Sequence, residues 1–165
     1  VNITNIARGG NLLRNGDMEQ GMTTDWITRW FTPMYLSTEA HSGKYAMRTL
    51  VDEDSYQPGG ANGIYQDIAD VVRRYGRGTY KVSVWVKKSS SATDSTRISL
   101  GISDQYDIGS AKVTIAPTTD WKKMEYIYQY NGNPETLSVL YFCVGYSDGG
   151  TKGFLMDDMI MEKIK

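Results

Sequence analysis

Cysteine and histidine are almost absent from this sequence. Its 165 residues contain one of each. A single cysteine excludes an internal disulfide framework, and a single histidine excludes most zinc sites and catalysis by several histidines. The chemistry of the chain therefore has to come from other residue types.

A surplus of one charge and long apolar runs are also missing. The chain has 18 lysines and arginines against 19 aspartates and glutamates, a net charge of −1 and a pI near 5.8. Nothing in this balance neutralises phosphate groups in bulk, and no apolar run approaches the roughly 20 residues of a membrane span. We expect no signal peptide within the first residues. We expect a soluble module, mature or excised from a larger protein, without a nucleic-acid or membrane partner.

Helical periodicity is scarce, whereas strand patterns are abundant. Residues 68–75 are the best helical candidate, but they stop at Gly76, which predicts a turn or one helical loop at most. Residues 79–87 alternate, with valines on one face and Trp85 on the other. Similar runs cover residues 97–103, 111–116, 121–130, 137–146 and 153–164. Many short strands bounded by turn residues predict an all-β fold, a β-sandwich or jelly roll of two antiparallel sheets.

The length is that of a single domain. Residues 1–10 end in Gly-Gly and are interpreted as a linker remnant, which leaves residues 11–165 as the domain. The aromatic content, with 12 tyrosines and four tryptophans, favours binding over catalysis.

Four segments together resemble the carbohydrate-binding modules of the family 4/9/22 type. They are Asn-Leu-Leu-Arg-Asn-Gly-Asp-Met-Glu-Gln-Gly at 11–21 with Asp25-Trp26, the His-Ser-Gly segment at 36–48, the strand 78–87, and Phe-Leu-Met-Asp-Asp-Met-Ile-Met at 154–161. The resemblance implies a β-jelly roll whose concave sheet forms a glycan cleft. The same scaffold also occurs in bacteriophage tail proteins and cell-surface adhesins. Met18 stands where the family motif usually has an aromatic residue, a conservative core exchange.

The resemblance also implies a structural calcium ion. Carried over position by position, its ligands are the carbonyl of Asp17, the side chain of Glu19, the carbonyl of Lys44 and Asp157. Calcium prefers six to eight oxygen ligands, both carboxylates and carbonyls, so these residue types suit it. The alternative is that Glu19 and Asp157 are exposed carboxylates, or pair with Arg14 and Lys44.

Sugars are gripped by aromatic faces and planar hydrogen-bonding groups. By the resemblance, the stacking aromatics are Tyr56, in the loop after the strand that ends the His-Ser-Gly segment, and Tyr106, after the strand 97–103. Gln105 offers an amide beside Tyr106, and Arg29 matches an arginine of family 22 modules. The alternative for either tyrosine is that it covers the rim of the sandwich.

Two further aromatics are candidates on the strands themselves. Trp85 lies opposite the valines of its strand, so it either stacks on ligand or is shielded by a loop. Tyr141 belongs to a strand with two apolar faces, and its side is open. Trp26 and Trp121 are assigned to packing. No acidic residue occurs on residues 137–146, where family 22 xylan binders carry a glutamate, so the ligand is expected to be a β-glycan or related polysaccharide that need not be xylan.

The leading hypothesis is a non-catalytic extracellular module that acts as a monomer. It would tether covalently linked catalytic or structural domains, such as a glycoside hydrolase, to a polysaccharide or oligosaccharide. A glycosidase needs two opposed carboxylates, whereas Asp157 and Asp158 are adjacent strand residues expected to point to opposite faces. Cys143 lies in an apolar run and is expected to be inert. The alternative is a structural or adhesive jelly roll of a cell-surface or phage tail protein, with a protein or surface-glycan partner.

Overall fold

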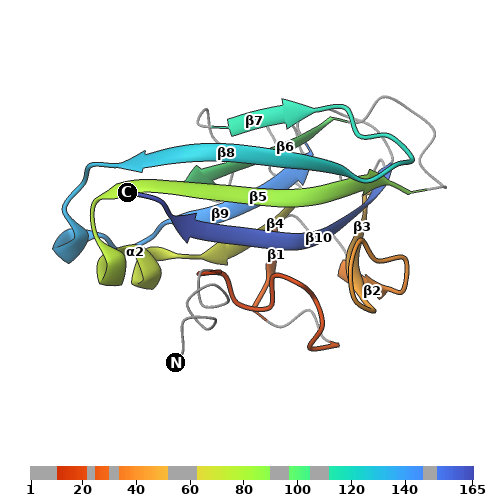
Figure 1. Cartoon of the computed structure of the whole chain (residues 1–165), viewed down its shortest axis with the longest axis horizontal. Helices are drawn as coiled ribbons and strands as arrows, with labels where there is room; N and C mark the ends of the chain where they lie inside the picture. Colours follow the sequence, from red (N-terminus) through yellow and green to blue (C-terminus); the bar gives the residue numbers. More distant parts are fainter. Residues whose placement is uncertain are drawn as a thin grey trace.

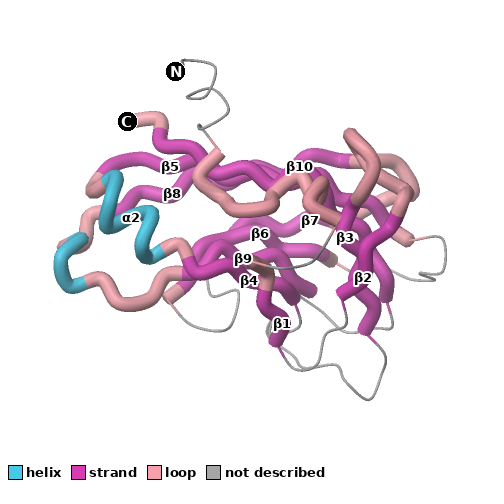
Figure 2. Tube along the Cα trace, turned by 90° about the horizontal axis from the view of Figure 1, so that it is seen from below, coloured by secondary structure: helices cyan, strands magenta, loops and turns pink. Residues whose placement is uncertain are grey.

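The alternating segments of the sequence form ten antiparallel strands in two five-stranded sheets. This computed structural model describes residues 11–21, 25–29, 34–51, 63–89, 97–104, 112–146 and 152–165. In these parts of the chain the two sheets lie face to face, as Figures 1 and 2 show. The prediction of an all-β sandwich is confirmed.

We name each sheet after one of its inner strands, β5 and β9. The β5 sheet has the order β2-β3-β10-β5-β8, with β2 Met34–Ser37, β3 Ala46–Val51, β10 Lys152–Lys163, β5 Gly78–Lys88 and β8 Lys122–Tyr130. The β9 sheet has the order β1-β4-β9-β6-β7, with β1 Ile27–Arg29, β4 Gly63–Asp67, β9 Tyr141–Tyr146, β6 Ile98–Ser103 and β7 Lys112–Ile115. Helix α2 (Ala69–Tyr75) follows β4, and a 3-10 turn η1 (Pro134–Thr136) precedes β9.

The core between the sheets is built from every second residue of each strand. On β5 the valines point inward and are fully buried. Methionine fills much of the remaining space, because its unbranched side chain adapts to irregular gaps. Six methionines are buried among the described residues: Met18, Met47, Met124, Met156, Met159 and Met161. Met18 therefore occupies the core position expected from the family motif.

Two expected elements differ from the sequence prediction. The segment before Gly76 forms a seven-residue α-helix, longer than the single helical loop expected, and it ends where Gly76 adopts a φ of 80°. The strand expected over residues 137–146 begins only at Tyr141, because Pro134 starts the 3-10 turn and Leu137 caps it. Residues 1–10 lie outside the described residues, so the linker boundary stays a prediction. None of the helices in the described ranges has the length and apolarity of a membrane span.

Candidate functional site

Three neighbouring strands of the β9 sheet present a distinct outward face. Their inward residues, such as Ile64, Phe142 and Leu100, join the main core, whereas Tyr65, Tyr141 and Cys143 form a separate cluster. The register sets the outward residues in rows across β4, β9 and β6. The rows are Asp67, Tyr141 and Ser103; Tyr65, Cys143 and Gly101; and Gly63, Gly145 and Ser99. We call these nine residues the tyrosine face.

The two tyrosines pack against each other at one end of this face. Their ring centroids are 6.3 Å apart and the rings are nearly perpendicular, at 85°. Although both face away from the core, Tyr65 is 1% exposed and Tyr141 is 6% exposed. They therefore form a packed floor, and the uncertainty about the side on which Tyr141 lies is resolved in favour of the outward face.

The other end of the tyrosine face has almost no side chains. Gly63 and Gly145 are paired across β4 and β9, and a Cβ atom added to Gly63 would lie 2.3 Å from the Val144 carbonyl oxygen. Beside them the hydroxyl groups of Ser99 and Thr114 are 2.7 Å apart and share a hydrogen bond. Of the nine residues of the face only Asp67 is charged, and its Oδ1 atom accepts a hydrogen bond from the N–H of Ala69. Apart from Asp67, the residues of the face are uncharged and buried.

Of the sugar-binding candidates Arg29, Gln105, Tyr106 and Tyr56, the structure describes only the position of Arg29. Arg29 ends β1, and its Cα atom pairs with Gly63 at the glycine end of the face. Gln105 and Tyr106 lie outside the described residues, as does Tyr56. The chain leaves β6 just after Ser103, which pairs with Tyr141, so Gln105 and Tyr106 follow in sequence directly from the tyrosine end.

Trp85 lies on the other sheet. It points outward from β5, and the imidazole ring of His41 stacks on it with centroids 4.0 Å apart and an interplanar angle of 16°. Trp121 meets the same imidazole edge-on at 5.6 Å. His41 therefore covers one face of Trp85, which is half-buried and lies on the other sheet from Tyr141, and a role of Trp85 in stacking on ligand stays a prediction. Trp26, with its side chain 4% exposed, packs edge-on against Phe142, which confirms its structural role.

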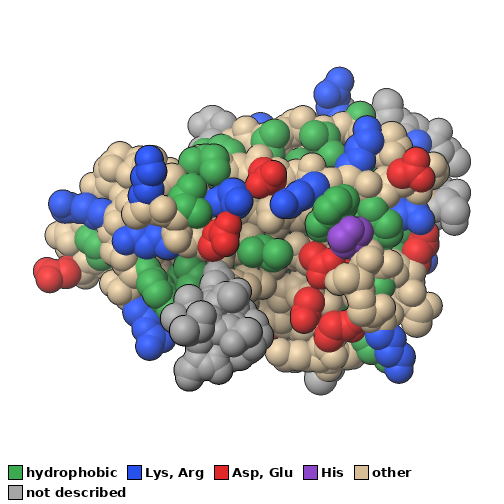
Figure 3. Space-filling view, viewed as in Figure 1, with side chains coloured by type: hydrophobic (Ala, Val, Ile, Leu, Met, Phe, Trp, Pro, Cys, Tyr) green, Lys and Arg blue, Asp and Glu red, His purple; other side chains and the backbone are tan. Residues whose placement is uncertain are grey.

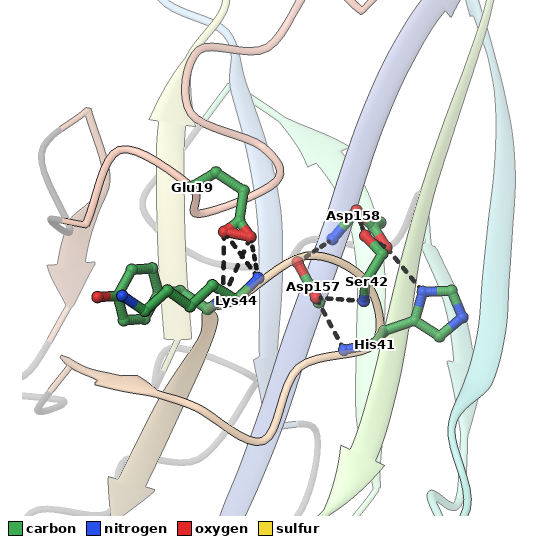
Figure 4. Close-up of polar contacts among 7 residues, drawn as sticks. Glu19, His41, Ser42, Lys44, Asp157 and Asp158 are labelled. Atoms are coloured by element: carbon green, nitrogen blue, oxygen red, sulfur yellow. Dashed lines mark hydrogen bonds and ion pairs between the residues drawn. The ribbon is translucent and has the colours of Figure 1, made fainter.

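The segment that covers Trp85 is held by acidic residues of β10. Asp157 is fully buried, and its Oδ2 atom accepts hydrogen bonds from the backbone N–H groups of His41 at 2.9 Å and Ser42 at 3.1 Å. Asp158 accepts from the hydroxyl of Ser42 at 2.7 Å, and its Oδ2 atom is also 2.7 Å from Nδ1 of His41 (Figure 4). Both carboxylates therefore contact the same turn, residues 41–42.

This arrangement corrects the expectation that Asp157 and Asp158 point to opposite faces. A β-bulge lies between Asp157 and Ile160, where β10 has one more residue than β5. Asp158 adopts a φ of 50° in this bulge, which turns its side chain back toward the turn that Asp157 holds. Alternation along a strand fails wherever a bulge adds a residue.

Glu19 holds the next part of the same turn from the opposite side. Its carboxylate accepts hydrogen bonds from the backbone N–H groups of Lys44 and Tyr45, with Oε2 at 3.0 and 3.2 Å from the two nitrogens (Figure 4). Gly43 adopts a φ of 64°, and a Cβ atom there would lie 1.9 Å from Oε1 of Glu19. The turn can approach this carboxylate closely because residue 43 is glycine.

The surroundings of Glu19 and Asp157 bear on whether these carboxylates could bind calcium. Of the alternatives, exposure holds for Glu19 and not for Asp157, which is fully buried, and neither carboxylate forms an ion pair with Arg14 or Lys44 in the described residues. Arg14 pairs with Asp25 and Asp70, and the Lys44 ammonium lies 5.1 Å from the centroid of the Tyr45 ring. Asp157 is buried, which raises its pKa to about 6. A buried carboxylate without a cationic partner is costly, and a bound cation would offset that cost.

The donor set is compatible with calcium and poor for zinc. Within the described ranges, no three or more histidine, cysteine, aspartate or glutamate side chains gather as metal ligands. The implied set has two carboxylates, and the carbonyl oxygens of Asp17 and Lys44 complete it, which suits a hard cation that accepts carbonyl ligands. The types of ligand in this set are those that calcium accepts, and both the site and the ion stay a proposal.

Sequence reasoning missed Tyr65 as part of the outward face. The signal was present: Gly-Ile-Tyr-Gln-Asp at 63–67 alternates, with Tyr65 opposite in phase to the core residue Ile64. Gln66 disguises this pattern, because it is a polar residue on the inward side. Its amide is 1% exposed, accepts from the N–H of Arg14 at 2.8 Å and donates to the carbonyl of Asp25 at 3.1 Å.

The family assignment rests on the sequence as a whole. Residues 10–150 match the family described as carbohydrate binding domain, of the family 4 and 9 type. The chain belongs to this family. A comparison of this carbohydrate-binding domain with curated proteins found no match.

Solved structures share its fold at low sequence identity. One is the xylan-binding domain CBM22-1 of Paenibacillus barcinonensis Xyn10C, with 20% identity and a TM-score of 0.65 over 94% of this chain and 92% of that chain. Another is the C-terminal family 22 module of Clostridium thermocellum Xyn10B, with 21% identity and a TM-score of 0.64 over 90% and 95% of the two chains. A third is a family 61 module in complex with β-1,4-galactotriose, with 17% identity and a TM-score of 0.60 over 93% and 99%.

Proposed function

We propose that this carbohydrate-binding domain is a non-catalytic module that binds a neutral polysaccharide or oligosaccharide at the tyrosine face. The observation that carries the proposal is the family match over residues 10–150. The nearly uncharged composition of the face supports a neutral ligand. Structures with the same fold include xylan-binding modules and a module in complex with β-1,4-galactotriose, which supports a β-linked glycan.

In this proposal the described residues supply the floor of the site. Tyr65 and Tyr141 pack into a rigid base, and Ser103 lies beside Tyr141 in the same row. The contacts to sugar come from Gln105 and Tyr106, which follow from this end of the face, with Tyr56 and Arg29 as further candidates. Trp85 has a structural role, because the imidazole of His41 covers it.

The calcium ion belongs to the same proposal. Glu19 and Asp157 would hold it with the carbonyl oxygens of Asp17 and Lys44, and it would add positive charge next to two carboxylates that lack a cationic partner among the described residues. Its role is structural, because these residues anchor the turn 41–45 on the β5 sheet, away from the tyrosine face.

We further propose that the module works outside the cell as a monomer and tethers linked catalytic or structural domains to the polymer. A few aromatic contacts and hydrogen bonds give dissociation constants of roughly micromolar to millimolar. Such affinity is useful when a tether raises the local concentration of the linked domain.

One observation favours a second candidate, a structural or adhesive module with a protein or surface-glycan partner. Tyr65, Tyr141 and Cys143 are all less than 10% exposed, so the described part of the face offers little open aromatic surface. A covered face is what we expect of a scaffold that keeps the fold without binding a glycan there.

A polysaccharide panel tests the proposed function. The domain is run by affinity electrophoresis through gels that contain xylan, β-1,4-galactan, mixed-linkage β-glucan or no polymer, with serum albumin as the non-binding reference. Retardation in at least one neutral β-glycan gel is the expected result. Migration equal to the polymer-free gel in all of them would favour the structural module.

A further inference from the structure

Cationic side chains gather at the end of the sandwich where helix α2 lies (Figure 3). The group consists of exposed residues of α2, the turn after it and the end of β10: Arg73, Arg74, Arg77, Lys163 and Lys165. We call this group the basic end. None of its residues belongs to the tyrosine face, and the basic end plays no part in the proposed glycan site.

Backbone contacts hold these cations around one short stretch of chain. The Lys163 ammonium donates to the carbonyl oxygen of Tyr75 at 2.8 Å, and the N–H of Thr79 donates to the carbonyl of Lys165 at 3.1 Å. Arg73 and Arg77 reach across to the segment before β9. They donate to the carbonyls of Leu137 at 2.6 Å and Gly132 at 2.8 Å.

None of these five cations forms an ion pair within the described part of the chain. The lysines on the outward face of the β5 sheet behave differently: Lys81 pairs with Glu162 at 3.2 Å, and Lys87 pairs with Glu39. Basic residues are favourable at the C-terminal end of a helix, which accounts for Arg73 and Arg74 in the last turn of α2. Capping a carbonyl uses one donor of a guanidinium that has five, so charge and donors remain available to a ligand.

The net charge of the chain is close to zero, and this value hides the separation of cationic and anionic side chains on its surface. The net charge is −1, yet several carboxylates, including Glu19, Asp157 and Asp158, lie around the turn 41–45 on the β5 sheet. The expectation of an uncharged partner therefore applies to the tyrosine face and not to the whole surface.

An aromatic side chain lies among the cations. Tyr75, the last residue of α2, is 44% exposed, and its carbonyl accepts the Lys163 ammonium. An exposed aromatic ring beside arginine and lysine suits a sugar ring that carries an acidic group, because the ring packs on C–H surfaces while the cations bind the anion.

The basic end also adjoins the tyrosine end of the proposed glycan site. Helix α2 follows directly after Asp67, and the N–H of Ile68 donates to the carbonyl of Leu140 at 2.7 Å, one residue before Tyr141. The two surfaces are therefore neighbours in the fold. We propose that the basic end is a second binding surface, for polysaccharide carrying carboxylate groups such as uronic acids; the choice of a polysaccharide rests on the proposed function.

The test compares polygalacturonate with its fully methyl-esterified form, which has the same backbone without charge. Binding is measured at 50 mM NaCl for the wild type, for Arg74→Gln/Lys165→Gln, and for the control Lys122→Gln/Lys123→Gln. The two double variants lose the same charge, and Lys122 and Lys123 lie at the opposite end of β8 from the basic end. No hydrogen bond of the Arg74 or Lys165 side chain occurs in the described residues, and the ion pair of Lys123 with Glu125 in the control is exposed and long, at 3.9 Å. Both double variants should therefore fold.

The wild type should bind polygalacturonate and not the ester. Removal of one exposed charge should weaken binding about threefold. Arg74→Gln/Lys165→Gln should therefore weaken it by roughly five- to tenfold, and the control by less than about twofold. Binding should also weaken steeply between 50 and 500 mM NaCl. Equal binding of acid and ester, no binding of polygalacturonate, or equal loss in the control would overturn the proposal. Tighter binding of oligothymidylate than of polygalacturonate would assign the surface to nucleic acid instead.

The two proposals fail separately. Binding of neutral β-glycan should be unchanged in Arg74→Gln/Lys165→Gln, because those side chains lie outside the tyrosine face. If no neutral β-glycan retards the domain but polygalacturonate binding is lost only in this variant, the tyrosine-face proposal fails and the basic end stands.

Discussion

At the scale of single residues, the turn 41–45 shows how carboxylates replace ordinary backbone pairing. Four consecutive or nearly consecutive N–H groups of this turn point at side-chain oxygens of Asp157 and Glu19. Hydrogen bonds to ionised acceptors are stronger than neutral ones. The arrangement depends on Gly43, which has the left-handed backbone and lacks the Cβ atom that would meet Glu19.

Substitution of Gly43 by alanine tests this dependence. Gly21 provides the matched control, because it has a similar φ of 71° but no atom within 4 Å of an added Cβ. Gly21→Ala should cost about 1–2 kcal/mol from backbone strain alone. Gly43→Ala should cost at least about 1 kcal/mol more, because Glu19 must move, and urea denaturation of both variants measures the difference. Equal costs would mean that the contact with Glu19 is not required.

At the scale of elements, alternation in the sequence predicts strands well where they are long and regular. Strands β5, β6, β8 and β10 lie where the pattern places them, because their inward residues are apolar and their outward ones are mostly polar. The short strands β1 and β2 have only three and four residues, too few for a period to emerge. Their positions are set by pairing with β4 and β3.

The candidate site is less predictable from sequence than the fold. The side of a residue on a strand follows from its phase, which predicted that Trp85 faces outward, but not that His41 from a distant segment covers it. The bulge at Asp158 likewise has no signature in local sequence, because it depends on the register between β10 and β5. Contacts between distant segments decide both outcomes.

The structural role of Trp85 leads to a prediction for the β5 sheet. Trp85→Ala removes the stacking with His41 and should lower the free energy of unfolding by about 2–3 kcal/mol, while glycan retardation of the folded variant stays unchanged. Tyr35→Ala is the control on the edge strand of the same sheet, since Tyr35 is 52% exposed and should cost little. Thermal denaturation and affinity electrophoresis are compared for both. Loss of retardation with unchanged stability would return Trp85 to the binding site.

At the scale of the whole molecule, the two outward faces have different tasks. The β5 sheet carries ion pairs, the shielded tryptophan and the anchored turn, all of which hold the fold together. The β9 sheet carries the tyrosine face, which is uncharged apart from Asp67 and is the proposed site of the glycan. Stability and binding are therefore expected to respond to different substitutions.

Calcium should affect stability and not binding under this division. At calcium concentrations about 100 times the dissociation constant, the ion adds about 2.7 kcal/mol of stability. EDTA should therefore lower the melting temperature by about 5–10 °C. Glu19→Gln should reduce this shift, whereas Glu39→Gln, which alters the pair with Lys87, should keep it. An unchanged melting temperature in EDTA, with no calcium in the purified protein by elemental analysis, would rule the ion out.

The most direct measurement of the central claim is affinity electrophoresis of Tyr106→Ala beside Trp85→Ala, in a gel of a neutral β-glycan that retards the wild type. Binding at the tyrosine face predicts that Tyr106→Ala migrates as in a polymer-free gel with a nearly unchanged melting temperature, while folded Trp85→Ala is still retarded. Full retardation of Tyr106→Ala together with lost retardation of Trp85→Ala would contradict the claim and place the glycan on the β5 sheet.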